Sequence, residues 1–318
     1  LGAERGAPCP LMPGGDLLRS LPMRIVSRGD FDSLACSVLL TEVETVKEFR
    51  FVHPKDAQDG KLPVDAEDIV CNVPYIPGCG LWFDHHVSEQ VKLPSVPYKG
   101  RFEIAPSCAR VIYNHYRKEH AAKLDRYTDL LTAADKLDSA QLDLQDVENP
   151  SGWILLGLTI DPRSGLGPDF QKYFRWLIEY VKELPVDKVL QHPEVKKRAD
   201  RVLQEQGEFK SLLAKHARME GTVVVTDFRG VKDKPVGNRF LVYTMFPQAN
   251  VELRLFNGHE GAVVAAVGHS IFNRTCPHNV GELLARYGGG GHRGAGSSRI
   301  PAGDLDRVVG ELLALIRQ

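Results

Sequence analysis

The stretch Arg24-Ile-Val-Ser-Arg-Gly-Asp30-Phe-Asp32-Ser-Leu-Ala-Cys36 places two carboxylates where an apolar strand pattern gives way to a helical one. On an extended chain, residues two apart point to the same side, so Asp30 and Asp32 can face one cleft while Phe31 turns away. Ligands of open parallel sheets collect at the carboxyl ends of strands, and paired carboxylates there suit hard divalent cations such as Mg²⁺ or Mn²⁺. Taken alone, the fragment also fits an Asp/Ser helix cap beside a solvated acid.

Short apolar runs alternate with helical patterns around this stretch, from Met23 to about Leu190. This alternation predicts an α/β fold in which helices cover both faces of a parallel sheet. The expected strands are 23–26, 49–52, 69–73 and 81–83, and the expected helices are 33–44, 107–117, 124–134 and 169–183.

A highly charged segment, 195–220, follows and resembles a long solvated helix between two bodies. Beyond it we expect strands at 222–227, 240–246, 251–255 and 262–267 and a helix at 279–286. The predicted domains are an extension (1–20), a catalytic domain with a parallel sheet (21–195), a linker helix (196–220) and a smaller mixed α/β domain (221–318).

Composition restricts the partners. Forty basic against forty-one acidic side chains give a formal charge of −1, so a long polyanion cannot be held by net charge alone. No apolar run approaches the ~20 residues that span a bilayer, and the first fifteen residues lack a signal-peptide pattern. We therefore expect a soluble, cytoplasmic protein with no membrane partner, whose six irregularly spaced cysteines are mostly buried thiols.

A second polar group, Asp84-His85-His86, ends the strand expected at 81–83. Neighbouring residues on an extended chain diverge, so one histidine can bind a metal while the other reaches the substrate, with Asp84 orienting a ring. A pair of surface histidines is the alternative. After the helix expected at 124–134, either Asp135 or Asp138 could complete the metal ligands, unless both belong to a polar turn.

The last motif is rich in glycine. Six glycines fall within the nine positions from Gly288 to Gly296, directly after the helix expected at 279–286. Such a run exposes backbone N–H groups and can wrap a phosphate, to which His292 and Arg293 add donors, whereas a bare glycine run can also be a linker.

In this order and spacing, the motifs resemble the DHH phosphoesterase superfamily, in the branch with a DHH-associated C-terminal domain that includes nanoRNases, cyclic-dinucleotide phosphodiesterases and exopolyphosphatase-like proteins. The resemblance runs from about Met23 to Ala302. It implies a two-metal hydrolase, usually Mn²⁺-dependent, that holds its substrate between two domains. Carried over, it makes Asp30, Asp32, His85 and Asp135 metal ligands, His86 a contact to the scissile phosphate, and Gly289, Gly290, Gly291 and His292 substrate-binding residues.

The chain departs from this family at three places. No histidine precedes Asp30, and Asn72 stands where the family has a metal-bridging aspartate, so Asn72 can offer only a neutral carbonyl oxygen. In the C-terminal domain Arg274, with Asn273 as a second donor, stands near the place of a family arginine, and a guanidinium suits bidentate phosphate contact. Because of the first two departures, the number of metal ions in the site, one or two, is left undecided.

The expected function is metal-dependent hydrolysis of phosphodiester or phosphoanhydride bonds in small phosphorylated molecules such as short oligonucleotides or linear or cyclic dinucleotides. The expected cofactor is Mn²⁺, with Mg²⁺ possible, and a homodimer is possible. No basic, aromatic-lined track for long single strands is present. The alternative is a nucleotide- or polyphosphate-binding sensor whose weakened metal site no longer turns substrate over.

Overall fold

The computed structural model describes residues 22–90, 97–160, 166–232, 235–258 and 261–317. The extension expected at 1–20 lies outside these residues. None of the helices in the described ranges is long and apolar enough to cross a membrane.

A five-stranded parallel sheet forms the first part of the molecule, in the order β2-β1-β3-β4-β5. Its strands are β1 (Met23–Ser27), β2 (Val46–Phe51), β3 (Asp68–Cys71), β4 (Leu81–Asp84) and β5 (Gly100–Phe102). The first four match the predicted strands, whereas β5, only three residues long, lies outside the prediction. Because the strand order reverses at β1, the carboxyl ends of β1 and β3 bound the crevice where ligands of such sheets bind.

The two faces of this sheet are covered differently. On one face Ile25, Ile69 and Phe83 pack against a helical layer. This layer contains α1 (Phe31–Val43), α4 (Cys108–Leu124), α5 (Thr128–Asp138), α7 (Gly152–Leu158), α8 (Pro168–Glu183) and α9 (Val186–Gln191). The other face carries short helix α2 (Pro54–Gln58) and loops, with Tyr75 and Tyr98 against Trp82. The prediction of a helical layer on both faces is therefore wrong for the second face, where the described residues that cover the strands are short helix α2 and aromatic loop residues.

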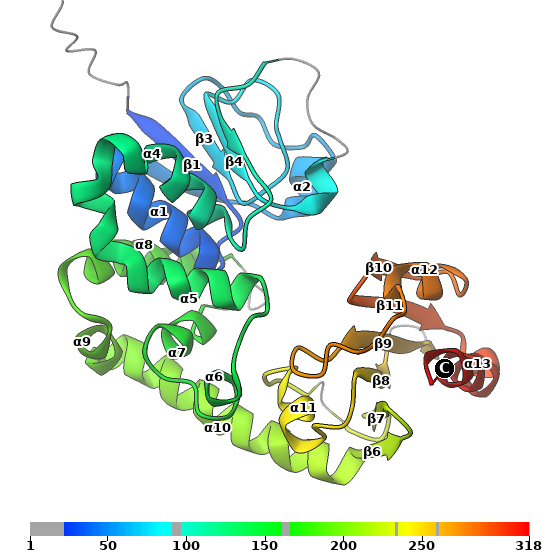
Figure 1. The fold of residues 1–318 in the computed structure, drawn as a ribbon. Helices are drawn as coiled ribbons and strands as arrows, with labels where there is room; N and C mark the ends of the chain where they lie inside the picture. The colour runs from blue at the N-terminus through cyan, green and yellow to red at the C-terminus, as the bar shows by residue number, and fades with distance from the viewer. Residues whose placement is uncertain (1–21, 91–96, 161–165, 233–234, 259–260, 318) are drawn as a thin grey trace, which may run out of the picture.

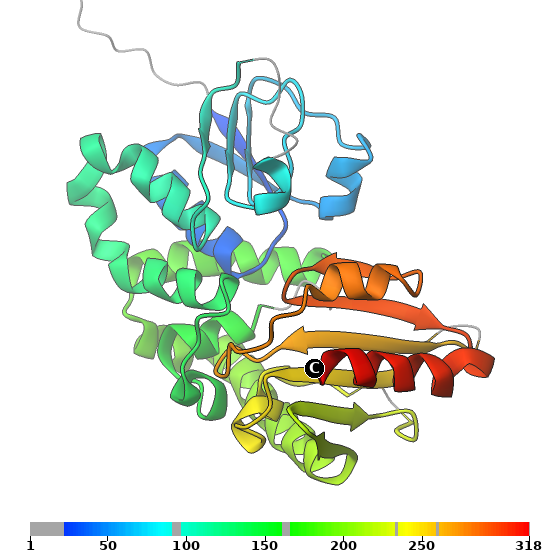
Figure 2. The same ribbon diagram turned by 45° about the vertical axis from the view of Figure 1, so that its right-hand side comes forward.

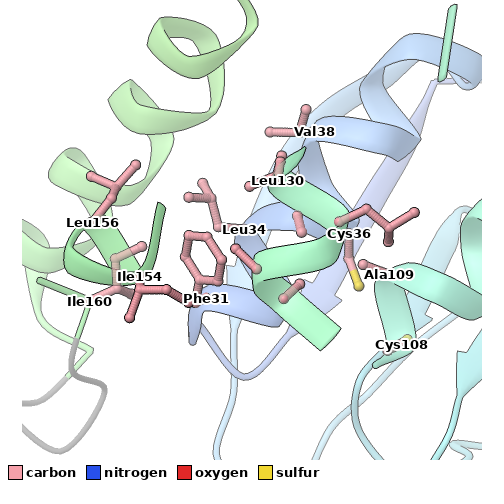
Figure 3. Packing of buried hydrophobic residues seen from close by; sticks show 14 of the residues in the cluster. Phe31, Leu34, Cys36, Val38, Cys108, Ala109, Leu130, Ile154, Leu156 and Ile160 are labelled. Carbon is pink, nitrogen blue, oxygen red and sulfur yellow. The ribbon is translucent and has the colours of Figure 1, made fainter. Parts of the chain in front are cut away.

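Helix α1 is buried on nearly all sides. Its residues 31–40 are all buried, because helices pack against it on the side away from the sheet. Figure 3 shows Phe31 directed toward Ile154 and Ile160, and Cys36 toward Ala109. Polar side chains in the first turn of α1 therefore lie in a protein interior.

A second, mixed sheet has the order β10-β11-β9-β8-β7-β6, with only β7 and β8 parallel. Its strands are β6 (Ala217–Glu220), β7 (Val223–Asp227), β8 (Val251–Asn257), β9 (Val263–His269), β10 (Gly290–His292) and β11 (Ala295–Ile300). Helices α12 (Val280–Ala285) and α13 (Leu305–Ile316) pack on one face. The mixed α/β architecture of the second part is as predicted.

Two expectations for this part are wrong. The strand expected at 240–246 is the helix α11 (Leu241–Met245), because this short apolar run packs on α6 (Leu144–Glu148) and α10 (Pro193–His216) instead of pairing with a strand. The linker helix expected to end at residue 220 is α10, which ends at His216, and the chain continues directly into β6.

Helix α10 touches both parts of the molecule, as Figures 1 and 2 show. Gln206 of α10 donates from Nε2 to the carbonyls of Val147 (3.1 Å) and Glu148 (3.0 Å). Further along the helix, Phe209 and Leu213 are buried in the same cluster as Phe228 of the second part. The predicted domain limits remain a prediction, but the packing through α10 is continuous.

Candidate metal centre

Asp30 and Asp32 lie at the turn from β1 into α1. Gly29 makes this turn with a φ of +78°, and a Cβ there would lie 3.1 Å from the rings of Phe51 and Phe170. Asp30 caps α1, accepting a hydrogen bond at Oδ1 from Ser33 N (2.9 Å). The segment is thus helical from Phe31 and not extended, so the helix cap is real and Asp32 enters the interior from the first turn.

Asp32 is 3% exposed and is held by the start of α4. Cys108 N donates to its Oδ2 (2.8 Å) and Ala109 N to its Oδ1 (2.9 Å), where the helix dipole favours negative charge. Burial nevertheless raises the pKa of Asp32 to about 7, reinforced by Asp138 and opposed by His85. The carboxylate therefore requires a nearby positive charge to remain ionised near neutral pH.

His85 faces two carboxylates with one ring nitrogen. Its Nδ1 lies 3.0 Å from the Ala105 carbonyl, which accepts from Nδ1–H and leaves Nε2 on the other side of the ring. Nε2 lies 3.1 Å from Asp138 Oδ2 and 3.9 Å from Asp32 Oδ2. Burial lowers the pKa of His85, but the contacts with Asp138 and Asp32 outweigh it and raise the pKa to about 9. Without a cation, the ring therefore carries a proton on Nε2 that faces Asp138 and Asp32.

Asp138, the last residue of α5, completes this group. Burial raises the pKa of Asp138, but His85 outweighs it and leaves the pKa below its ordinary value. One oxygen or nitrogen from each of Asp32, His85 and Asp138 lies within 4.8 Å of the others, a spacing that can hold a metal ion. We call these three residues the acid cluster.

Asp84 and His86 form a separate pair beside the acid cluster. Asp84 Oδ1 lies 2.7 Å from His86 Nδ1 and also accepts from His85 N (2.8 Å). Asp84 is fully buried, so it fixes the orientation of the His86 ring. His86 Nε2 then faces away from Asp84 and lies 3.4 Å from Arg28 Nη1.

Asn72 lies next to Asp30 at the end of β3. Its backbone has a φ of +58°, which asparagine tolerates better than most residues, and its side chain is fully buried. Nδ2 donates to Asp30 Oδ1 (3.0 Å) and to Ser33 Oγ (3.2 Å). The structure therefore brings Asp30 and Asn72 together, with Asn72 acting as a donor toward the acid.

Asp135 lies outside the acid cluster, so of the two aspartates that could complete the ligands, the structure brings Asp138 next to Asp32 and His85. Arg110 binds its Oδ2, and Ser107 Oγ donates to its Oδ1 (2.7 Å). Ser107 is also the N-cap of α4, so Asp135 braces the helix start that holds Asp32. Asp138, one helical turn further on, occupies the place expected of Asp135.

Three buried polar atoms around the site have no hydrogen-bond partner among the described residues. They are Asn72 Oδ1, Asp84 Oδ2 and His85 Nε2, although Asp138 lies close to the last. Unpaired buried oxygen and nitrogen atoms are costly and are characteristic of positions that a cation or ordered water completes. Carboxylate oxygens with one imidazole suit Mn²⁺ or Mg²⁺, so the residues present fit a divalent cation.

Residues expected to bind substrate in the second part lie at two places. Asn273 Nδ2 donates to Gln248 O (3.0 Å), so its amide joins its loop to the segment between α11 and β8. The exposed Arg274 donates from Nη2 to Ala140 O (3.3 Å), two residues after Asp138. Among the residues of the second part that were predicted to bind substrate, Arg274 thus contacts the chain next to the acid cluster.

The glycine-rich segment is a β-hairpin and not an open loop. We call residues 288–297 the glycine hairpin, in which β10 pairs with the start of β11. A Cβ on Gly291 would lie 2.3 Å from Ala295 O, whereas one on Gly290 would meet nothing within 4 Å. His292 is exposed, and no hydrogen bond or ion pair joins this hairpin to the acid cluster within the described ranges. Close backbone packing explains part of the glycine content.

Sequence reasoning misses Arg28 and does not settle on Asp138. In the segment before Asp30, the sequence shows only that the histidine typical of the family is lacking. The structure shows that Arg28 lies there, with Nε 2.7 Å from Asp30 Oδ2. The signal that favours Asp138 over Asp135 is the apolar stripe of α5. Asp138 continues the series Tyr127, Leu131, Ala134 at steps of four and three residues.

Solved structures resemble this chain to different degrees. The pGpG-specific phosphodiesterase PggH from Vibrio cholerae shares 36% sequence identity and a TM-score of 0.82, over 92% of this chain and 98% of that one. The exonuclease RecJ bound to manganese (15% identity, TM-score 0.54, 93% and 90% covered) and the DHH domain of a member of the s1p family of ribosomal proteins (14%, 0.55, 93% and 87%) share the fold. No protein-family model and no curated protein matches the chain.

Proposed function

Since the chain belongs to the DHH phosphoesterase superfamily, we propose that it hydrolyses the phosphodiester bond of short linear nucleotides, with a 5′-phosphorylated diribonucleotide such as pGpG as its first substrate. Mn²⁺ is the proposed cofactor. The proposed substrate rests on the similarity to PggH, and the proposed chemistry rests on the site of this chain.

The observation that carries the proposal is the convergence of Asp32, His85 and Asp138 from three separate elements onto one point. These residues would hold the cation. When bound, a divalent cation supplies neutralisation of charge on phosphoryl oxygens and lowers the pKa of a water.

The remaining residues position the reacting groups. In the hydrolysis, a water oxygen bonds to phosphorus and gives up a proton, the bond from phosphorus to the leaving oxygen breaks, and the leaving oxygen takes up a proton. His86, oriented by Asp84 through Nδ1, presents Nε2 for a hydrogen bond to the phosphate. Arg274 can bind the far phosphate of a short substrate, since it lies beside the end of α5.

The test is a substrate panel with purified full chain and Mn²⁺ or Mg²⁺. The panel holds pGpG, other linear diribonucleotides, cyclic dinucleotides, a longer oligoribonucleotide, a 3′,5′-bisphosphorylated nucleotide and polyphosphate. We expect linear diribonucleotides to be hydrolysed fastest and Asp138→Asn to lower kcat/KM for pGpG by about 100-fold or more. No turnover of any compound with either metal would refute the proposal.

A second function is favoured by one observation. The Asp30 carboxylate is engaged by Arg28 and Asn72, so the site offers fewer free ligands than its acids suggest. Such a site could bind a nucleotide without hydrolysing it. Saturable pGpG binding with no product after prolonged incubation would identify the chain as a sensor.

A further inference from the structure

Two groups of polar side chains share this site, and they differ in chemistry. The acid cluster has two acids, an imidazole nitrogen without a well-aligned partner, and no arginine hydrogen-bonded to any of its members among the described residues. The second group is centred on Arg28 and contains Asp30, Asn72 and His86. The rings of His85 and His86 are 4.4 Å apart, so the groups are adjacent.

Hydrogen-bond donors already occupy most of the acceptor positions of the Asp30 carboxylate. Its Oδ1 accepts from Ser33 N (2.9 Å) and from Asn72 Nδ2 (3.0 Å), which uses both lone-pair directions of that oxygen. Its Oδ2 pairs with Arg28 Nε at 2.7 Å. A metal ion at Asp30 would therefore have to displace the guanidinium, and Asn72 would add no negative charge to hold it.

Arg28 brings a permanent positive charge to this place. A guanidinium stays protonated at any relevant pH. Its Nη1 lies 3.4 Å from His86 Nε2, the ring atom opposite the one that Asp84 holds. The side chain is 32% exposed, so the rest of its fork is accessible to a phosphate oxygen.

The two groups differ in the charge that their acids contact directly, although Arg28 also lowers the pKa of Asp138 from a distance. Asp32 and Asp138 together match one divalent cation, whereas Arg28 neutralises Asp30. A second divalent cation beside Arg28 would meet like charge without an additional acid, because Asn72 is neutral. The remaining acid, Asp84, binds His86 Nδ1 and His85 N through Oδ1, and its buried Oδ2 has no hydrogen-bond partner among the described residues. Asp84, His85 and His86 also lie close enough together to hold an ion, but this group has one acid where the acid cluster has two.

We propose that the Arg28 guanidinium takes the place of a second metal ion, so that the chain binds one divalent cation, at the acid cluster, and contacts a non-bridging phosphate oxygen through Arg28. This inference rests on the proposed function for its phosphate contact. The metal count that it predicts is independent of any activity.

The test is Mn²⁺ binding to the full chain, measured by isothermal titration calorimetry and by metal analysis after gel filtration. We expect one Mn²⁺ per chain for the wild type and for Arg28→Ala, and two for the double variant Arg28→Ala/Asn72→Asp. Two Mn²⁺ bound to the wild type would overturn the inference, whether or not the chain hydrolyses pGpG.

Kinetics test the phosphate contact. We expect Arg28→Ala to lower kcat for pGpG by about 100-fold or more and Arg28→Lys to recover about 10-fold of it, because the lysine restores charge without the fork. Arg229→Ala, which removes an exposed arginine paired with Asp227 in the second part, is the control and should leave kcat unchanged. A kcat of Arg28→Ala within about threefold of wild type would overturn the inference.

The outcomes separate the two proposals. A wild type that binds one Mn²⁺ but hydrolyses nothing would refute the proposed function and leave the metal count standing. A wild type that hydrolyses pGpG with two Mn²⁺ would refute the role of Arg28 alone. If Arg28→Ala does not fold, the wild-type stoichiometry and the Arg28→Lys variant still decide.

Discussion

The acid cluster and the glycine hairpin differ in what their surroundings leave unsatisfied. In the cluster, His85 Nε2 is buried and lacks a well-aligned partner between two acids. In the hairpin, a backbone oxygen lies within 2.5 Å of the position that a Cβ would occupy on Gly291 or on Gly296, so packing alone requires both glycines. Both segments have conspicuous sequences, but an unpaired buried polar atom belongs to the acid cluster itself, whereas no described residue of the hairpin has one. Unpaired buried groups therefore indicate chemistry more directly than unusual composition does.

The strongest test of this comparison is the matched pair of variants Asp138→Asn and Asp135→Asn. We expect Asp138→Asn to lower Mn²⁺ affinity and kcat/KM for pGpG by about 100-fold or more, because the acid cluster loses a charge. Asp135→Asn should instead cost about 1 kcal/mol in the free energy of unfolding, since Arg110 loses its carboxylate. Calorimetric titration, steady-state kinetics and urea unfolding of both variants provide the measurements. Equal loss of Mn²⁺ affinity in both would contradict the assignment.

Asn72→Asp tests the charge balance around Asp30. The new carboxylate would face Asp30 Oδ1, now 3.0 Å from Asn72 Nδ2, inside a fully buried environment. Without metal we expect the melting temperature to fall by several degrees, as for a loss of about 1–3 kcal/mol, and Mn²⁺ to restore more stability than in the wild type. Thermal unfolding with and without Mn²⁺ measures both. An unchanged melting temperature in the absence of metal would show that the two side chains do not face each other.

The hairpin half of the comparison is tested by Gly291→Ala against Gly290→Ala. A Cβ at Gly291 meets Ala295 O at 2.3 Å, so we expect that variant to lose about 1–3 kcal/mol of stability. A Cβ at Gly290 meets nothing, so its stability should change by less than about 0.5 kcal/mol. A raised KM for pGpG in Gly290→Ala with unchanged stability would then reveal a substrate contact. Similar stability losses in both would show that the hairpin packs differently.

A smaller effect is proton release on metal binding. His85, with a pKa raised to about 9, is protonated at pH 8 without metal, and a cation must displace that proton. Below pH 7 Asp32, with a pKa raised to about 7, also carries a proton that is lost. Calorimetric titrations in buffers of different ionisation enthalpy should show about one proton released at pH 8 and nearly two near pH 6. Release that does not rise as the pH falls would contradict these protonation states.

Much of the fold follows from the sequence because its signals are local. The strands β1 to β4 and the amphipathic helix α8 follow from apolar runs and a three-and-four-residue period. Helix α11 could not be found this way, since five apolar residues fit a strand or a helix, and packing between α6 and α10 decides. Helix α13 has a clear period but is absent from the prediction.

The candidate site was only partly predictable for a different reason. Asp30, Asp32, Asp84, His85 and His86 follow strands whose ends meet at one edge, so their proximity follows from the sheet. Choosing Asp138 over Asp135 requires the rotation of α5 about its axis, which the apolar stripe of α5 only indicates and the contact of Arg110 with Asp135 fixes. The position of Arg28 between Asp30 and His86 depends likewise on contacts across the sheet.

The most direct test is the anomalous scattering of Mn²⁺ in crystals of the full chain. We predict one strong peak bonded to Asp32, His85 and Asp138, with Arg28 still paired with Asp30. A peak bonded instead to Asp30 and Asp84, or no peak at the acid cluster, would contradict the assignment of this site.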